Sequence, residues 1–272
     1  MLKKAFLILL SLLLAASLIA CNKSDTDGEK VPPPGLGDDL NKPEEEEAPA
    51  TLVAGEDIAG TQLKWEIYSD HTMYVTCKDT TSGTCVLPDY AKNGTTPKGT
   101  VLTDQPWWKY GGKHENDRAE DDGGSYTVQK LIIGEGITAL GDYAFAYMEL
   151  LEEVVLPFSL TEISYKSFED CPKLKTVSGG FGVTLIESEA FLSCSALTTI
   201  ELSPGLAEVQ DKAFDKVLTA GSTRTLTLRI KGTAESWSVA MDSMRSTENA
   251  DGFPCLGADN AAFENATVEY VS

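Results

Sequence analysis

A pattern that repeats every 23 residues constrains this chain more than any other feature of its sequence. One column of the pattern is phenylalanine, and three others are Leu, Ile or Val. In order, the columns are Phe145, Phe168, Phe191 and Phe214; Leu140, Ile163, Ile186 and Val209; Leu151, Leu174 and Leu197; and Val154, Val177 and Ile200. A period of about 20–29 residues with apolar residues at fixed offsets is typical of a solenoid. Each coil can bury its apolar face only against its neighbours, so the stacked columns are predicted to form one core.

Each coil contains one short segment with the pattern of a β-strand. Leu151–Pro157 is an apolar run that ends at a proline, and Leu174–Val177 and Leu197–Leu202 occupy the same position in the following coils. Strands stacked about 4.7–4.9 Å apart would form a parallel sheet along one face. The Ala-Phe segments are too short for long helices, so we expect tight helical turns that place each ring inside its coil.

The run Ile137–Phe145, followed by Leu151–Pro157, resembles the BspA-like leucine-rich repeat family, whose repeat is roughly I-G-x-x-A-F-x-x-C-x-x-L-x-x-V-x-I-P. Cys171 and Cys194 stand where that family often has its cysteine. The resemblance covers the repeats, residues 131–230, and implies a leucine-rich-repeat solenoid, an α/β fold that is mainly β. It also implies a cell-surface protein of the adhesin type. It is much less informative about activity.

The composition divides the chain into five parts. They are a lipoprotein signal peptide (1–20), a disordered acidic tether (21–50), a β-rich N-terminal cap (51–130), the repeats (131–230) and a small C-terminal cap (231–272). Caps are expected because a bare solenoid end exposes core and strand edges. In the N-terminal cap, Leu63–Tyr68 and Thr72–Thr76 alternate and predict a hairpin. In the C-terminal cap, the apolar spacing predicts a helix over 235–245 and a strand over 267–271.

The first residues have the pattern of a bacterial lipoprotein signal. A basic start precedes an apolar run, and Leu18-Ile-Ala-Cys21 closes it. This order predicts that Cys21 is lipidated and anchors the chain to a membrane leaflet without spanning it; an ordinary cleavable signal with a chance cysteine is the alternative. The acids that follow Cys21 resemble those of surface-exported lipoproteins of Gram-negative anaerobes. They imply an outer-membrane lipoprotein exposed on the cell surface, with a periplasmic location left open.

Cysteine usage suggests one disulfide. Of six cysteines, five remain once Cys21 is assigned to lipid. Cys77 and Cys85 flank a short polar segment and are predicted to pair, which would contribute about 2–4 kcal/mol. Cys171 and Cys194 lie one coil apart, where a bond is geometrically possible, but a column of small buried thiols is the preferred interpretation. Cys255 has no role that the sequence assigns.

Signals for catalysis, metal binding and nucleic-acid binding are weak. The chain has only two histidines and no Gly-x-Ser-x-Gly, phosphate-loop or His-Glu-x-x-His motif. We therefore predict a protein that is not an enzyme and that holds no cofactor or structural metal. The acids between Asp117 and Asp122 lack the order of an EF-hand. A net charge of −20 disfavours nucleic acid, because it repels the phosphate backbone.

Binding is the function class that remains. Strand positions between the buried columns are expected to face solvent on a regular surface. They are Glu153, Val155, Thr176, Ser178, Thr199 and Glu201. The first hypothesis is that this face binds an extracellular protein, although each residue could simply be hydrated. The second is a glycan-binding lipoprotein in which Trp107, Trp108 or Tyr110 stacks on sugar rings, with packing inside the cap as the competing interpretation of the tryptophans. The third is a purely structural surface role. The sequence does not name the ligand or the oligomeric state.

Overall fold

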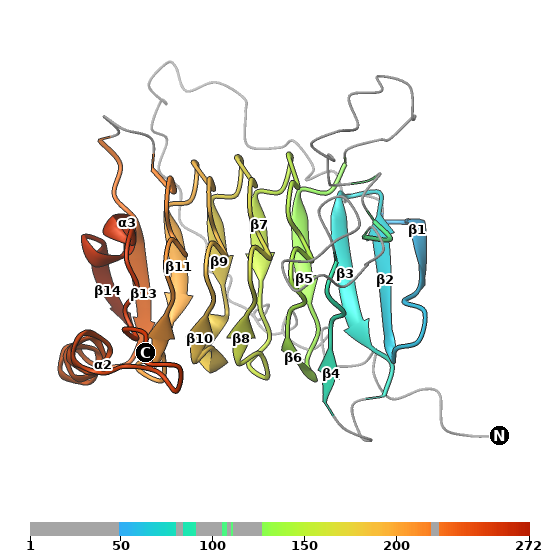
Figure 1. Ribbon diagram of the computed structural model, residues 1–272. Coiled ribbons are helices and arrows are strands. Elements are labelled where there is room, and N and C mark those ends of the chain that lie inside the picture. The colour runs from blue at the N-terminus through green and yellow to red at the C-terminus, as the bar shows by residue number, and fades with distance from the viewer. Residues whose placement is uncertain (1–48, 80–83, 91–104, 108–109, 111–126, 219–222) are drawn as a thin grey trace, which may run out of the picture. The chain divides into compact units, whose positions relative to one another are not determined.

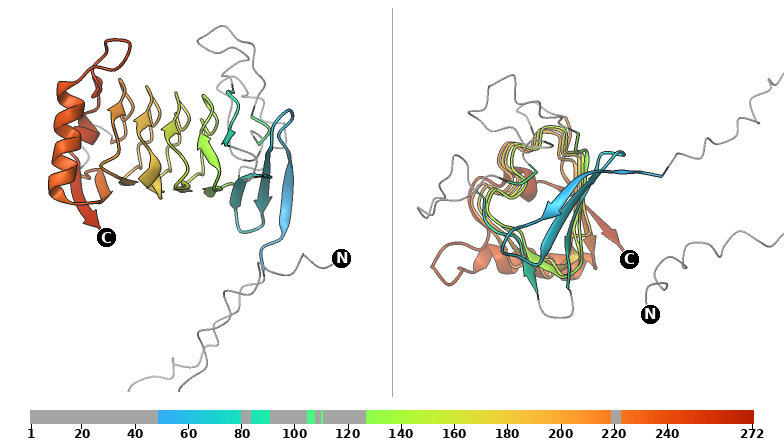
Figure 2. Two further views of the ribbon diagram at one scale, coloured as in Figure 1. Left: turned by 90° about the horizontal axis from the view of Figure 1, so that it is seen from below. Right: turned by 90° about the vertical axis from the view of Figure 1, so that its right-hand side faces the viewer.

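The computed structural model describes residues 49–79, 84–90, 105–107, 110, 127–218 and 223–272. In this part of the chain, strands follow one another along a single stack of coils (Figure 1). Seen along the stack, the coils of the repeats overlay one another (Figure 2). The leucine-rich-repeat solenoid predicted from the 23-residue period is confirmed. The predicted signal peptide, Cys21 and nearly all of the predicted tether lie outside the described residues.

Two sheets run along the stack. The larger has nine strands, in the spatial order β1 (Leu52–Asp57), β2 (Leu63–Tyr68), β3 (Thr72–Cys77), β5 (Lys130–Ile133), β7 (Glu153–Val155), β9 (Thr176–Ser178), β11 (Thr199–Leu202), β13 (Thr227–Lys231) and β14 (Thr267–Val271). The smaller has five, in the order β12 (Glu208–Val209), β10 (Leu185–Ile186), β8 (Glu162–Ile163), β6 (Ile137–Ala139) and β4 (Cys85–Val86). Each coil of the repeats therefore contributes one strand to each sheet.

The register of the larger sheet explains why the period is strict. Val154 pairs with Val177, and Val177 with Ile200, in parallel strands. All three are fully buried, while their neighbours along each strand face outward. A strand alternates its side chains between the two faces of a sheet, so one missing residue would turn a coil's apolar side toward water.

The core of the stack is a ladder of phenylalanine rings. Neighbouring rings of the repeat column are 5.3–5.6 Å apart between centroids and nearly parallel. The ladder is longer than the sequence column, because Trp107 stacks on Phe145 at 5.2 Å and Phe263 stacks on Phe214 at 5.2 Å. All of these rings are buried. The two caps thus continue the core with aromatic residues that do not keep the 23-residue step.

Backbone hydrogen bonds join each coil to the next at these same phenylalanines. The Phe145 amide donates to the Ser167 carbonyl at 2.8 Å, and the amides of Phe168 and Phe191 make the equivalent bonds to the following coils. Phe214 has no further repeat beside it, and its amide donates instead to the side-chain oxygen of Asn260 at 3.0 Å. Asn260 is fully buried and gives its own amide hydrogens to the carbonyls of Gln210 and Gly257.

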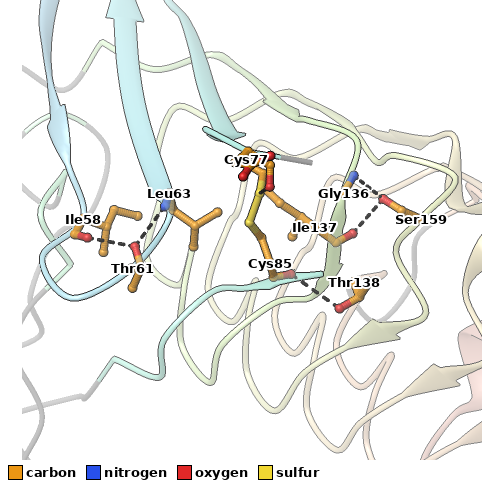
Figure 3. Close-up of a disulfide and its surroundings, with 10 residues drawn as sticks. Ile58, Thr61, Leu63, Cys77, Cys85, Gly136, Ile137, Thr138 and Ser159 are labelled. Carbon is orange, nitrogen blue, oxygen red and sulfur yellow. Dashed lines mark hydrogen bonds between the residues drawn. A yellow bond between two sulfur atoms is a disulfide. The ribbon is translucent and has the colours of Figure 1, made fainter. Parts of the chain in front are cut away.

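The N-terminal cap is an antiparallel meander of β1, β2 and β3, which joins the repeats by parallel pairing of β3 with β5. The predicted hairpin is confirmed, with Trp65 paired to Val75. The predicted disulfide between Cys77 and Cys85 is present and links the end of β3 to β4 (Figure 3). It therefore connects the large sheet to the small one at the start of the stack. The indole nitrogen of Trp107 donates to the Ala144 carbonyl at 3.1 Å, which satisfies an acceptor of the first coil.

The C-terminal cap contains the predicted helix and strand. Helix α2 (Ala234–Ser246) begins with a capping box between Thr233 and Ser236. Its buried stripe is Trp237, Ala240, Met241 and Met244, as the spacing predicted. The short helix α3 (Ala261–Glu264) carries Phe263, and β14 completes the sheet. A single-turn 3-10 segment, η1 (Gly180–Gly182), follows β9.

The remaining cysteines are buried free thiols. The Cys171 thiol donates to the Phe145 carbonyl at 3.2 Å, and the Cys194 thiol donates to the Phe168 carbonyl at 3.1 Å. Each thiol therefore bonds back to the preceding coil, which agrees with the predicted column of small buried residues. Burial raises the pKa of the Cys194 thiol well above its ordinary value, so the thiol stays protonated. Cys255 is also a buried free thiol.

Candidate binding surface

The outward face of the nine-stranded sheet gathers all six strand residues that the sequence predicted. Glu153, Thr176 and Thr199 pair in one row across three strands. Val155 and Ser178 pair in a second row, which Glu201 extends on the next strand. All six are partly exposed and alternate with buried residues. The structure therefore brings them together on one regular surface, which we call the outward sheet face.

The charges of this face are paired, although the chain as a whole is strongly acidic. Glu153 forms an ion pair with Lys130 at 3.0 Å. Glu201 is bound by Arg229 on the neighbouring strand, and its carboxylate also accepts the Gly179 amide. Beside the face, Lys175 bonds to Glu152 at 2.6 Å. The hydrogen bond and charge of this lysine lower the pKa of Glu152. Opposite charges on adjacent strands neutralise one another, so the face offers little net charge to a partner.

An apolar row crosses the middle of the outward sheet face. Ile132 pairs with Tyr74 on one side and with Val155 on the other, and all three side chains point outward. Only Val155 was among the predicted residues. Ile132 had a signal in the sequence, because it alternates with the buried Leu131 and Ile133.

A solvent-exposed phenylalanine stands at the edge of this face. Phe158 follows β7 and is 69% exposed. The carboxylate of Glu135 accepts the backbone amides of Phe158 and Ser159, at 2.9 and 3.2 Å, and so fixes this corner of the coil. One coil later, Phe181 occupies the same position with the Lys231 ammonium 5.1 Å from its ring centroid. Sequence reasoning missed Phe158, although a phenylalanine outside the periodic column was a visible signal.

Trp107 does not take part in the predicted sugar platform. Trp107 is fully buried between Phe145 and Tyr90, so neither face of its indole is open to a ligand. The glycan hypothesis is wrong for this residue, and the packing interpretation is confirmed. Trp108 lies outside the described residues. Tyr110 is only partly buried and packs against the core beside Trp65.

A second polar cluster serves to hold coils together. Lys166 lies between the carboxylates of Glu169 and Glu189, at 2.7 and 3.0 Å, and above the ring of Tyr165. Burial alone would lower the pKa of Lys166, but its hydrogen bonds to the two carboxylates outweigh burial and raise the pKa. The lysine therefore stays charged at neutral pH and is a poor general base. Within the described ranges, no three His, Cys, Asp or Glu side chains are grouped to hold a metal ion.

Among the described residues, no helix combines the length and the apolar composition that crossing a bilayer requires.

Comparisons with known proteins agree with this architecture. Residues 124–227 match the family model described as "BspA type Leucine rich repeat region (6 copies)". No curated protein matches the sequence. Among solved structures, a leucine rich cell surface protein from Faecalibacterium prausnitzii is 14% identical, with 65% of this chain and 40% of that chain covered and a TM-score of 0.37.

Two further solved structures are similar at the same level. A leucine-rich repeat protein from Eubacterium ventriosum is 17% identical, with 67% of this chain and 45% of that chain covered and a TM-score of 0.43. The T. pallidum leucine rich repeat protein is 16% identical, with 75% of this chain and 82% of that chain covered and a TM-score of 0.36. The chain thus spans less than half the length of the F. prausnitzii and E. ventriosum proteins. Residues 124–227 of this chain are therefore repeats of the BspA type of leucine-rich repeat.

Proposed function

We propose that this chain is a non-enzymatic cell-surface protein that binds a protein partner on the outward sheet face. The observation that carries the proposal is the exposed Phe158, which follows Val155 of the apolar row by three residues at the end of β7. Aromatic anchors surrounded by neutral or charge-paired contacts are the usual energetic centre of a protein interface. The paired charges along the same face lower the cost of bringing a partner close.

The type of the repeats supports the same class of function. The F. prausnitzii relative in fold is described as a cell surface protein. Repeat proteins commonly use the regular face of the solenoid to bind other proteins. The proposal extends to an outer-membrane lipoprotein anchored through Cys21, because the leader pattern closes on that cysteine.

Binding is tested with the full chain immobilised and probed with a panel of purified extracellular-matrix proteins and surface proteins of neighbouring bacteria. We expect at least one to be retained. Phe158→Ala should then weaken its binding by roughly tenfold or more, because the exposed ring is the anchor. Phe253→Ala is the matched control, since Phe253 is 66% exposed on the C-terminal cap.

A second matched pair tests the middle of the face. Val155→Asp places an unpaired charge in the apolar row and should also abolish binding, whereas Val239→Asp on the exposed side of α2 should not. Equal effects of both aspartates, or of both phenylalanine truncations, would exclude the outward sheet face. Retention of no protein would favour a purely structural surface role.

Location is tested on intact cells. Protease added outside should digest the chain, and Cys21→Ser should release it from the membrane fraction. Complete protection from the protease would place the chain inside the outer membrane and rule out adhesion.

A further inference from the structure

A hollow lies on the outward side of the N-terminal hairpin, formed by β2 and β3. Its volume is about 390 Å³, which falls in the range of about 300–1,000 Å³ that is usual for small-ligand sites. The residues that matter for its chemistry are Tyr68, Tyr74, Lys64, Glu66, Asp70 and Thr76. Neither the repeat pattern nor the proposed protein-binding function accounts for this hollow.

Hydrogen bonds of the local backbone hold one wall of the hollow in place. The Thr51 amide donates to the Ser69 hydroxyl at 3.0 Å, and the Ser69 amide donates to the Thr51 carbonyl at 2.9 Å. These two hydrogen bonds hold Ala50, which lines the hollow, beside the end of β2. The floor is the paired hairpin itself, in which Glu66 is opposite Tyr74 and Lys64 is opposite Thr76. The hollow is therefore built from rigid elements.

Two tyrosine rings supply the aromatic surface. Tyr68 and Tyr74 meet edge to face, with centroids 5.5 Å apart and an interplanar angle of 82°. Both side chains are only partly buried. Both tyrosines line the hollow, so the pair gives it an aromatic surface. Such a surface suits the apolar C–H face of a pyranose ring, while the hydroxyls of the tyrosines remain available at its rim.

The polar groups around the rings are both donors and acceptors, with one ammonium beside two carboxylates. The Lys64 ammonium lies 3.0 Å from the Glu66 carboxylate. One oxygen of Asp70 accepts the Thr72 amide at 3.1 Å, which leaves the carboxylate with further lone pairs. The Thr76 hydroxyl is buried and has no hydrogen-bond partner among the described residues. A ligand rich in hydroxyls could use the Lys64 ammonium and the Glu66 and Asp70 carboxylates, whereas the buried Thr76 hydroxyl is out of its reach.

We propose that this hollow binds a neutral sugar residue of a glycan. A neutral ligand is favoured because Lys64 already compensates Glu66, and the one remaining carboxylate, that of Asp70, is engaged on one oxygen by the Thr72 amide. A hydroxyl-bearing ligand is favoured because the site offers carboxylate acceptors and an ammonium donor around aromatic rings. Tyr74 also belongs to the apolar row through its pairing with Ile132, but Phe158 does not line the hollow, so the Phe158 variant tests the protein-binding face apart from the sugar site.

The test uses the full chain on an array of neutral oligosaccharides built from glucose, galactose, mannose and N-acetylglucosamine. Wild type should be retained by at least one of them. Tyr74→Ala should weaken that binding by roughly tenfold or more, because it removes the stacking surface. Tyr74→Phe keeps the ring and should retain most of the affinity.

Tyr270→Ala is the matched control, since Tyr270 is an exposed tyrosine on β14 at the other end of the sheet. It should bind as wild type does, and the melting temperature of each variant shows whether it is folded. Three outcomes would overturn the proposal: no retained oligosaccharide, equal binding by Tyr74→Ala and wild type, or binding of a lysine- or arginine-rich peptide in the hollow instead. Phe158→Ala should leave sugar binding unchanged, which separates this site from the protein-binding face.

Discussion

The interior coils and the two ends of the stack satisfy the backbone hydrogen-bonding groups of the core in different ways. In the interior, the amide of each core phenylalanine is satisfied by the backbone of the next coil, as Phe168 is by Ala190. At the C-terminal end, the partner is a side chain, because the Asn260 side-chain oxygen accepts the amide hydrogen of Phe214. At the N-terminal end, the Trp107 indole supplies the donor for Ala144. In the repeats, backbone groups of neighbouring coils are each other's hydrogen-bond partners, whereas each end depends on the side chain of a single residue.

Removing an interior ring tests the regular part and has the largest expected effect. Phe168 is fully buried between Phe145 and Phe191. Phe168→Ala should lower the free energy of unfolding by about 3–5 kcal/mol, because a cavity opens in the middle of the ring ladder. Urea denaturation measures this loss. An unchanged midpoint would show that the rings do not form the core.

Removing the side-chain amide of Asn260 tests the C-terminal end of the stack and should lower the free energy of unfolding by nearly as much. Asn260→Ala removes the partner of the Phe214 amide and of the Gly257 carbonyl in a buried place, whereas the Gln210 carbonyl still accepts the Ala213 amide. Two unsatisfied buried groups should lower the free energy of unfolding by about 2–4 kcal/mol. Asn265→Ala is the control, because Asn265 is exposed and caps only its own short helix. If the two variants were equally stable, the end would not depend on Asn260.

A smaller effect is expected from backbone strain that every coil repeats. Tyr143, Lys166, Glu189 and Lys212 occupy one column with φ between 54° and 59°. Such left-handed residues cost about 1–3 kcal/mol unless they are glycine. Lys212→Gly should therefore stabilise the chain by about 1 kcal/mol after the entropy cost of glycine is subtracted.

The control for this change is Lys173→Gly, at an exposed lysine that is not left-handed. It should destabilise the chain slightly, because glycine there adds only flexibility to the unfolded state. Thermal melts of both variants give the comparison. Destabilisation by Lys212→Gly equal to that of Lys173→Gly would mean that the coils carry no strain at this position.

The sequence predicted the interior well because identical coils impose identical demands. The Phe, Leu and Val columns identified the buried residues, and alternation along the strands identified Glu153, Thr176 and Thr199 as outward-facing. Each of these inferences needed only local pattern and a constant step. The helix and strand of the C-terminal cap were also predictable, since helix α2 has its own apolar stripe.

The ends were harder to predict because their core residues do not follow the 23-residue step, so no periodic pattern marks them as buried. Trp107 lies 38 residues before Phe145, well off the repeat step, and nothing in its neighbourhood marks it as a ring of the ladder. Phe263 did have a signal, because Ala262-Phe263 repeats the Ala-Phe pair of the coils after the insertion that contains α2. Asn260 had none, because a buried asparagine cannot be distinguished from a turn asparagine by sequence pattern.

The residues of the candidate sites also differ in whether the sequence predicted them. Val155 was predicted because it belongs to a repeated strand position. Phe158 and the hollow at Tyr68 and Tyr74 were not. Phe158 shares its coil position with Phe181 but differs from it in exposure, and the hollow depends on the pairing of two cap strands. Individual function on a repeat scaffold is therefore best sought where the repetition stops.

Native-state hydrogen exchange at the amides of Phe145, Phe168, Phe191 and Phe214 tests the central claim most directly. Because the caps seal one continuous ladder, all four amides should exchange with the same, global free energy of opening. Phe214 is decisive, because only Asn260 accepts its hydrogen. Exchange of Phe214 far faster than that of Phe168 would show that the C-terminal end is open, and would contradict the account.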